Sequence, residues 1–190
     1  MTAESTLVHL LGPAGVGKLT IARELAPSLK ARVVDNQWIN NPVLGLLDND
    51  RMSPYPTAVW KEIEKVRSAV LETIARISPP SANYIFTNEL YDDDPEDRPI
   101  LGMVMDAARQ RNAPYIPIRL QCAAAELARR VVAPERALRL KSMNPHAAHR
   151  TALRPVITTG SPNELTVDTT NRSPTAIVAI IAAHILQVRA

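Results

Sequence analysis

The sequence predicts an α/β protein in which helices cover both faces of a parallel sheet. Five short apolar segments alternate with helical segments along the chain, which is the order that parallel sheets require. Three of the chain's six glycines, Gly12, Gly15 and Gly17, stand between the first strand and the first helix, where they indicate an unusual backbone path. With 190 residues, the chain is expected to form one domain, 1–190, with a full hydrophobic core.

The first third of the chain begins with a predicted buried strand over 6–11, which is apolar and ends at Gly12-Pro13. A helix is predicted over 18–29, because Ile21, Ala22, Leu25 and Leu29 share one face. A second strand is predicted over 31–35. Residues 36–56 contain three prolines and are predicted to be irregular.

The middle of the chain is predicted to hold two helices around one strand. Apolar residues recur at spacings of three and four over 57–77, and Ser78-Pro79-Pro80 ends that helix. A third strand is predicted over 83–87. The acidic run 92–97 contains proline and no glycine, so it is expected to be a solvated loop rather than a metal site. A helix follows over 99–112.

The last third is predicted to contain two strands and the remaining helices. A strand is predicted over 115–120, although Pro117 is unusual inside a strand. A helix is predicted over 123–132, and 133–155 is expected to be basic and helical in places. The fifth strand is predicted over 164–168. Ser173 and Pro174 suit the N-cap and first position of a final helix.

Composition excludes several classes of protein. The chain is 46% hydrophobic and 22% charged, which rules out collagen, coiled coil and wholesale disorder. No apolar run reaches the length of roughly 18 residues that a membrane span needs. The net charge of +3 has no obvious basic stripe, so nucleic acid is not an expected partner. Cys122 is the single cysteine and Met1–Ser5 lack a basic signal region, so we expect a cytoplasmic protein.

The segment Gly12-Pro13-Ala14-Gly15-Val16-Gly17-Lys18 fits the phosphate-binding pattern G-x-x-x-x-G-K, the Walker A motif, between a strand and a helix. Backbone N–H groups must surround the phosphates, so intruding side chains are excluded. We therefore expect ATP to be bound by the following residues: Gly12, Ala14, Gly15, Val16, Gly17, Lys18, Leu19 and Thr20. Lys18 is the predicted catalytic cation at the β- and γ-phosphates.

Leu19 stands where many such loops have the Ser or Thr that binds Mg²⁺, and Thr20 follows it. Thr20 either helps to hold the metal, through water, or packs. The pattern is similar to the G-K-G-T ending of adenylate kinases. The chain resembles the P-loop kinase superfamily, near adenylate, shikimate and gluconate kinases and antibiotic phosphotransferases. That resemblance implies a three-layer P-loop NTPase fold, with strand order 2-3-1-4-5 and a basic helical lid.

Asp35 ends the second strand, at the sheet edge where doubly wound folds bind ligands. The resemblance implies that Asp35 accepts or orients the acceptor hydroxyl; alternatively, it caps a turn. Residues 36–56 are the expected acceptor segment, where Trp38 forms an apolar wall or simply packs, and Asn36, Gln37 and Asn40 suit hydroxyl groups. Arg51 is the only basic residue there, so a nucleoside monophosphate is not favoured.

The third strand ends in Thr87-Asn88-Glu89 and lacks the aspartate that many P-loop proteins use around Mg²⁺. Thr87 and Glu89 belong to the metal shell, to the acceptor pocket or to a plain polar cluster. Shikimate kinases have glycines after the threonine at this place. Their absence argues against shikimate as the substrate.

Residues 126–154 contain seven Lys or Arg and two Glu, at the place where P-loop kinases carry a mobile lid. Guanidinium groups match the charge on a transferring phosphoryl group. Arg136 is the first candidate for catalysis, and Arg129 and Arg130 are candidates for nucleotide binding; the alternative is a solvated basic helix. The region has no aromatic residues, which disfavours RNA binding.

These observations predict an ATP- and Mg²⁺-dependent phosphotransferase that acts on a hydroxyl of a small molecule, as a monomer or homodimer. The resemblance to these kinases implies that the turn 168–174 lies beside adenine. The guanine-reading pattern N-K-x-D does not occur, so ATP is expected rather than GTP. The alternative is a nucleotide-binding ATPase or switch protein without phosphotransfer to a small molecule.

Overall fold

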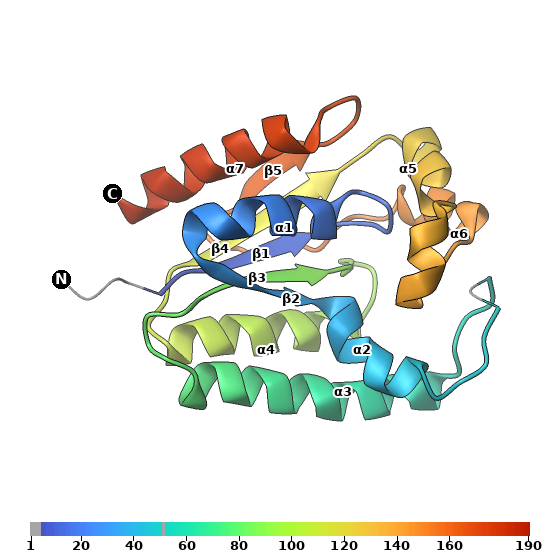
Figure 1. Ribbon diagram of the computed structural model, residues 1–190, viewed down its shortest axis with the longest axis horizontal. Helices are drawn as coiled ribbons and strands as arrows, with labels where there is room; N and C mark the ends of the chain where they lie inside the picture. Colours follow the sequence, from blue (N-terminus) through green and yellow to red (C-terminus); the bar gives the residue numbers. More distant parts are fainter. Residues whose placement is uncertain (1–4, 51) are drawn as a thin grey trace.

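The computed structural model describes residues 5–50 and 52–190. Residues 1–4 and Arg51 lie outside these ranges. The prediction that the chain start lacks a signal region therefore falls, except for Ser5, on residues that are not described. Five strands form one parallel sheet in the order β2-β3-β1-β4-β5 (Figure 1). The strands are β1 (Leu7–Leu11), β2 (Ala31–Asp35), β3 (Asn83–Asn88), β4 (Tyr115–Gln121) and β5 (Leu165–Asp168). The predicted strand order is confirmed.

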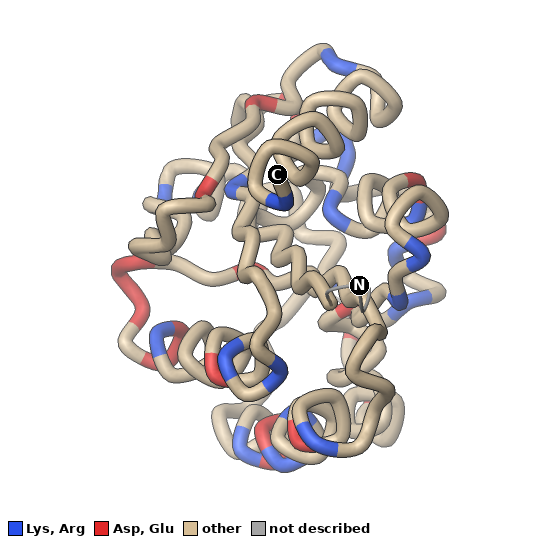
Figure 2. Tube along the Cα trace, turned by 90° about the vertical axis from the view of Figure 1, so that its left-hand side faces the viewer, with Lys and Arg blue, Asp and Glu red and all other residues tan. Residues whose placement is uncertain are grey.

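Helices form a layer on each face of this sheet (Figure 2). Helices α1 (Lys18–Leu29) and α7 (Pro174–Arg189) pack on one face, where Ile21, Leu25 and Ile181 contribute to one core cluster. Helices α3 (Thr57–Glu72) and α4 (Asp97–Gln110) cover the other face. The three-layer architecture is therefore the predicted one.

Alternation along β1 explains how one strand serves both cores. Val8 and Leu10 pack with α1 and α7, whereas Leu7 joins the cluster on the α3 and α4 face. His9 lies on that second face and is fully buried. A fully buried polar side chain requires partners, and those partners lead to the functional site described below.

The prediction of an irregular segment after β2 is wrong for its first half. Helix α2 (Asn36–Leu44) begins directly after Asp35 and contains Pro42. Proline removes one backbone donor near the helix end, while burial of Ile39 and Leu44 holds the helix against the sheet. The predicted helix 57–77 is present, but its last turn, Thr73–Ile77, is π-helical.

Pro117 is tolerated inside β4. Pairing of β4 with β5 begins one residue later, at Ile118, so at Pro117 only β1 is paired with this strand, through His9. The predicted Ser173 cap of α7 is also present, because its side chain accepts a hydrogen bond from the Ala176 backbone N–H.

The basic region after β4 is helical, as predicted. It contains α5 (Ala124–Val131), a 3₁₀ helix (Pro134–Arg139) and α6 (Pro145–Thr151). These elements lie beyond the carboxyl ends of the strands (Figure 1). The term lid is used below for residues 126–154.

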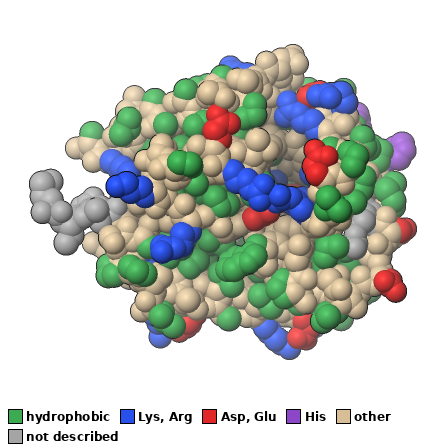
Figure 3. Space-filling view, in the orientation of Figure 1, with side chains coloured by type: hydrophobic (Ala, Val, Ile, Leu, Met, Phe, Trp, Pro, Cys, Tyr) green, Lys and Arg blue, Asp and Glu red, His purple; other side chains and the backbone are tan. Residues whose placement is uncertain are grey.

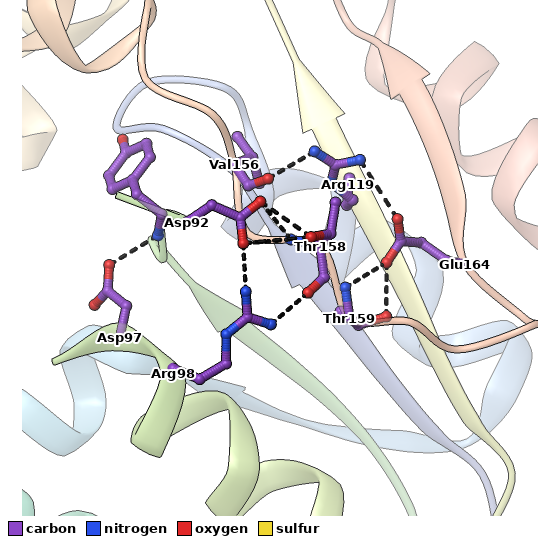
Figure 4. Close-up of polar contacts among 9 residues, drawn as sticks. Asp92, Asp97, Arg98, Arg119, Val156, Thr158, Thr159 and Glu164 are labelled. Atoms are coloured by element: carbon purple, nitrogen blue, oxygen red, sulfur yellow. Dashed lines mark hydrogen bonds and ion pairs between the residues drawn. The ribbon is translucent and has the colours of Figure 1, made fainter. Parts of the chain in front are cut away.

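The acidic run is a largely exposed loop, as expected, but two of its carboxylates also have partners elsewhere in the chain. Asp92 accepts hydrogen bonds from Arg98 and from the backbone and hydroxyl of Thr158 (Figure 4), and Asp93 pairs with Arg154. The run therefore anchors the chain that leaves the lid. Sequence spacing hides this role, because two of the partners, Arg154 and Thr158, lie about sixty positions away.

No helix within the described part of the chain is long and apolar enough to cross a membrane.

Candidate active site

The loop between β1 and α1 has the backbone geometry that a phosphate site requires. Gly12 has φ of 154°, and a Cβ atom there would lie 2.6 Å from the Leu120 carbonyl oxygen. Gly17, with φ of 103°, precedes α1, whose first turn has no acidic side chain. The free N–H groups and positive end of α1 therefore meet no competing carboxylate from its own first turn.

Lys18 lies across this loop. Its Nζ donates hydrogen bonds to the carbonyl oxygens of Gly12, at 2.6 Å, and Pro13, at 2.9 Å. Burial lowers the pKa of Lys18 to about 8, against the raising effect of the Glu89 carboxylate, and the positive charges of Lys141 and Arg136 lower it further. A buried cation whose charge is this poorly compensated is suited to gaining an anion.

A cavity of about 890 Å³ opens beside the loop. Its lining combines the phosphate loop from Ala14 to Thr20, Asp35, Thr87 and Glu89 at the strand ends, and cationic side chains of the lid. Figure 3 shows Lys and Arg side chains gathered around a hollow on this face. One cavity thus brings together the glycine-rich loop, carboxylates and several cations.

Asp35 is held in one orientation at the end of β2. Its Oδ1 accepts a hydrogen bond of 2.8 Å from the Thr87 hydroxyl, and its Oδ2 lies 3.5 Å from Lys141 Nζ. The Thr87 hydroxyl in turn accepts from the Asn36 backbone N–H. The Asp35 side chain is 15% exposed, so the carboxylate is fixed yet still reaches the cavity.

A buried polar network supports the start of α2. Asn36 Oδ1 accepts hydrogen bonds from Arg67 and from Asn88 Nδ2, at 2.9 and 3.0 Å. Asn88 Oδ1 contacts His9 Nε2, and His9 Nδ1 contacts the Tyr115 hydroxyl. Burial lowers the pKa of His9 to about 4, so the imidazole is neutral at physiological pH. This network fixes Asn36, which itself lines the cavity.

The predicted arginines of the lid differ in their surroundings. Arg136 donates to the Ser142 carbonyl oxygen, and burial lowers its pKa while Glu89 raises it. Arg129 and Arg130 both pair with Glu126. All three arginines line the cavity, so the lid brings together the three guanidinium groups that the sequence singled out.

Only some of the other predicted site residues line the cavity. Thr20 is exposed and lines the cavity, as does Gln37. Asn40 is buried and is not among the cavity's lining residues. Trp38 is 61% exposed, which excludes the alternative that it packs in the core.

Three further residues of the site were not singled out from the sequence. Lys141 was counted only as one charge of the lid, yet it pairs with Asp35. His9 and Arg67 belong to the network beneath Asn36. For His9, the only local signal was a histidine within the apolar run of β1. For Arg67, it was an arginine on the apolar face of α3.

Comparison with solved structures identifies the fold. A sugar kinase from a Janibacter species has a TM-score of 0.63 and 14% identity, over 95% of this chain and 94% of that chain. A gluconokinase from Sinorhizobium meliloti has a TM-score of 0.62 and 12% identity, over 99% and 95%. An APS kinase from Mycobacterium tuberculosis, in complex with AMPPNP and APS, has a TM-score of 0.59 and 13% identity, over 96% and 98%.

No model of a protein family matches the sequence, and a search of curated proteins finds no match. The structural matches cover nearly the whole of each chain at low identity, and the sheet order agrees with the predicted one. The resemblance inferred from the phosphate loop is thereby confirmed at the level of the fold. The chain has the fold of the P-loop small-molecule kinases.

Proposed function

We propose that this protein is an ATP-dependent kinase that transfers the γ-phosphoryl group to a hydroxyl group of a small molecule. The observation that carries the proposal is the shared cavity of about 890 Å³, which joins the phosphate loop to Asp35 and to the arginines of the lid. Phosphoryl transfer needs the donor, the acceptor oxygen and neutralising cations within one enclosed site.

The nucleotide end of the cavity is built from the phosphate loop. Backbone N–H groups from Ala14 to Leu19 surround the phosphates, and Lys18 moves from the loop carbonyls to the β- and γ-phosphates. Arg130, Arg172 and Pro174 also line the cavity, which supports the predicted adenine end. The bound AMPPNP in the structurally similar APS kinase supports a nucleotide in this fold.

Asp35 orients the acceptor at the opposite end. Its carboxylate accepts a hydrogen bond from the acceptor hydroxyl, whose oxygen then forms a bond to the γ-phosphorus while the bond to the β–γ bridging oxygen breaks. Orientation matters more than deprotonation in such a loose transition state. The Thr87 hydrogen bond and the Lys141 ion pair keep the carboxylate in position.

The lid neutralises the charge on the transferred group. Arg136 is the first candidate, because it is half-buried beside the cavity and its pKa is raised by Glu89, as that of Lys18 is. Arg129 and Arg130 are paired with Glu126 and would contact the nucleotide. A closed lid also excludes the water that would hydrolyse ATP.

The cavity offers oxygen ligands that suit Mg²⁺. Glu89 and Asp35 provide carboxylates, and Thr20 and Thr87 provide hydroxyl groups. In kinase sites Mg²⁺ is held by one or two carboxylates together with phosphates and water, so this set fits. Glu89 and Thr20 are the residues that would hold it, and the ion would neutralise charge on the phosphates.

The test is ADP release from Mg-ATP, measured with and without each member of a panel of sugars, nucleosides, antibiotics and amino-acid alcohols. One acceptor class should raise ADP release well above the hydrolysis background, and Lys18→Ala should abolish that increase. If ATP binds but no acceptor changes the rate, the alternative of a nucleotide-binding ATPase or switch replaces the kinase.

A further inference from the structure

A second hollow continues the cavity along the edge of the sheet, between α1 and α2. This groove has a volume of about 320 Å³. Asp35, Gln37, Arg23 and Arg139 line both the groove and the main cavity. A molecule with one end at Asp35 can therefore extend into the groove without leaving the site.

One wall of the groove is an unpacked aromatic ring. Trp38 in the first turns of α2 lines it and is 61% exposed. An indole ring exposes a large apolar face to water, at a cost that a planar ligand removes by stacking on it. Guanidinium groups beside such a ring also favour planar, electron-rich partners.

The charge of the groove is unbalanced. Arg23 from α1 and Arg139 from the lid line it, and neither forms a hydrogen bond or ion pair with any residue in 5–50 or 52–190. Asp35 is the one carboxylate among the described lining residues, and it is already bound by Thr87 and Lys141. Two guanidinium groups without a carboxylate partner complement an anionic ligand.

One amide side chain in the wall of the groove has an acceptor without a hydrogen-bond donor. Asn41 lines it, and its buried Oδ1 accepts no hydrogen bond from the described residues. A buried amide oxygen without a donor is uncommon in native proteins. This oxygen is covered by protein, so the complementarity to an anion comes from the two arginines.

We infer that the groove binds the distal part of the phosphoryl acceptor, and that this part is a planar ring bearing a carboxylate or similar anion. The ring stacks on Trp38, and the anion lies between Arg23 and Arg139. The acceptor hydroxyl then lies at Asp35. This inference rests on the proposed kinase function, since it names the class of acceptor for that same site.

A nucleoside monophosphate was not favoured as the acceptor because residues 36–56 contain a single basic residue. That prediction counted cations only within residues 36–56. In the folded chain, α1 supplies Arg23 and the lid supplies Arg139, so the cations reach the acceptor segment from elsewhere in the sequence.

The test uses two probes that differ only in charge, 4-(hydroxymethyl)benzoate and 4-(hydroxymethyl)benzamide. Binding is followed by NMR through the indole N–H signals of Trp38 and Trp60, assigned with Trp38→Phe and Trp60→Phe. Trp60 is the matched control, since it is 46% exposed on α3 and does not line the groove.

The benzoate should shift the Trp38 signal saturably and leave Trp60 unchanged. The benzamide should bind about fivefold more weakly or worse, because it makes no charge-assisted hydrogen bonds. Arg23→Gln and Arg139→Gln should each weaken benzoate binding toward the benzamide level while leaving the rest of the spectrum of the free protein unchanged.

Equal binding of the two probes, unchanged binding in both arginine variants, or no movement of the Trp38 signal would overturn the inference. AMPPNP is titrated into the same samples. If AMPPNP binds and the benzoate does not, only the acceptor class is wrong. If the benzoate binds and AMPPNP does not, the proposed kinase function fails while the anion groove stands.

Discussion

Replacing Gly12 by alanine would place a Cβ atom 2.6 Å from the Leu120 carbonyl oxygen and 3.1 Å from Val16 Cγ1. The first contact is with backbone of β4, which cannot move without disturbing the sheet. Overpacking of this kind costs about 1 to 3 kcal/mol, and a φ of 154° costs a non-glycine residue a similar amount, about 1 to 3 kcal/mol. We therefore expect Gly12→Ala to lower the free energy of unfolding by about 2 to 6 kcal/mol.

Gly102→Ala is the matched control. Gly102 lies within α4, and a Cβ atom there would meet nothing within 4 Å. Alanine should therefore stabilise the helix by about 0.5 to 1 kcal/mol. Thermal unfolding should show Tm falling by about 4 to 24 °C for Gly12→Ala and rising by about 1 to 4 °C for Gly102→Ala. If the two variants shift Tm equally, the loop does not approach β4 as described.

Three further predictions concern the ionisable side chains of Lys18, His9 and Asp92. Because the pKa of Lys18 is lowered to about 8, Lys18 loses its positive charge as pH rises, and the affinity for AMPPNP should fall by up to about tenfold between pH 7 and 9. The Lys18→Met variant should lose this pH dependence in calorimetric titrations. An equal change of affinity with pH in both proteins would contradict the role of Lys18 in binding the phosphates. The folded-state pKa of His9, about 4 against 6.5, means that the unfolded chain takes up the proton first, so up to about 3 kcal/mol of stability is present above pH 6.5 and lost toward pH 4. Urea unfolding of His9→Gln should therefore depend less on pH in that range than wild type, and parallel curves would refute a neutral buried imidazole. Asp92→Ala removes the carboxylate that accepts hydrogen bonds from both Arg98 and Thr158, so the free energy of unfolding should fall by about 1 to 2 kcal/mol. Limited proteolysis should then cleave residues 152–164 faster than in the wild type. An unchanged cleavage rate would show that the contacts of Asp92 do not anchor this segment.

The features predicted correctly from the sequence are those with a local cause. The strand 7–11 and the helix 18–29 follow from hydrophobic periodicity, and the phosphate loop follows from glycine spacing that the positive φ values of Gly15 and Gly17 explain. The strand order came from the resemblance to P-loop kinases. Pairing such as that of Leu10 with Thr87 joins residues far apart in sequence and leaves no local pattern.

The features that were missed depend on tertiary contacts. Helix α2 forms in spite of Pro42 because the sheet buries Ile39 and Leu44, which outweighs one lost hydrogen bond. Lys141 and Asp35 are paired only after the lid folds over β2. Local reasoning about residues 36–56 could not find cations that arrive from other elements.

The most direct test of the central claim is the steady-state kinetics of Asp35→Asn with an acceptor identified by ADP release. Asparagine keeps the hydrogen bond from Thr87 but lacks the charge that orients the acceptor hydroxyl and pairs with Lys141. The account predicts that kcat for phosphorylated acceptor falls at least about a hundredfold, while AMPPNP affinity stays within about twofold of wild type. An Asp35→Asn variant that phosphorylates the acceptor at the wild-type rate would contradict the assignment of this cavity as a kinase active site.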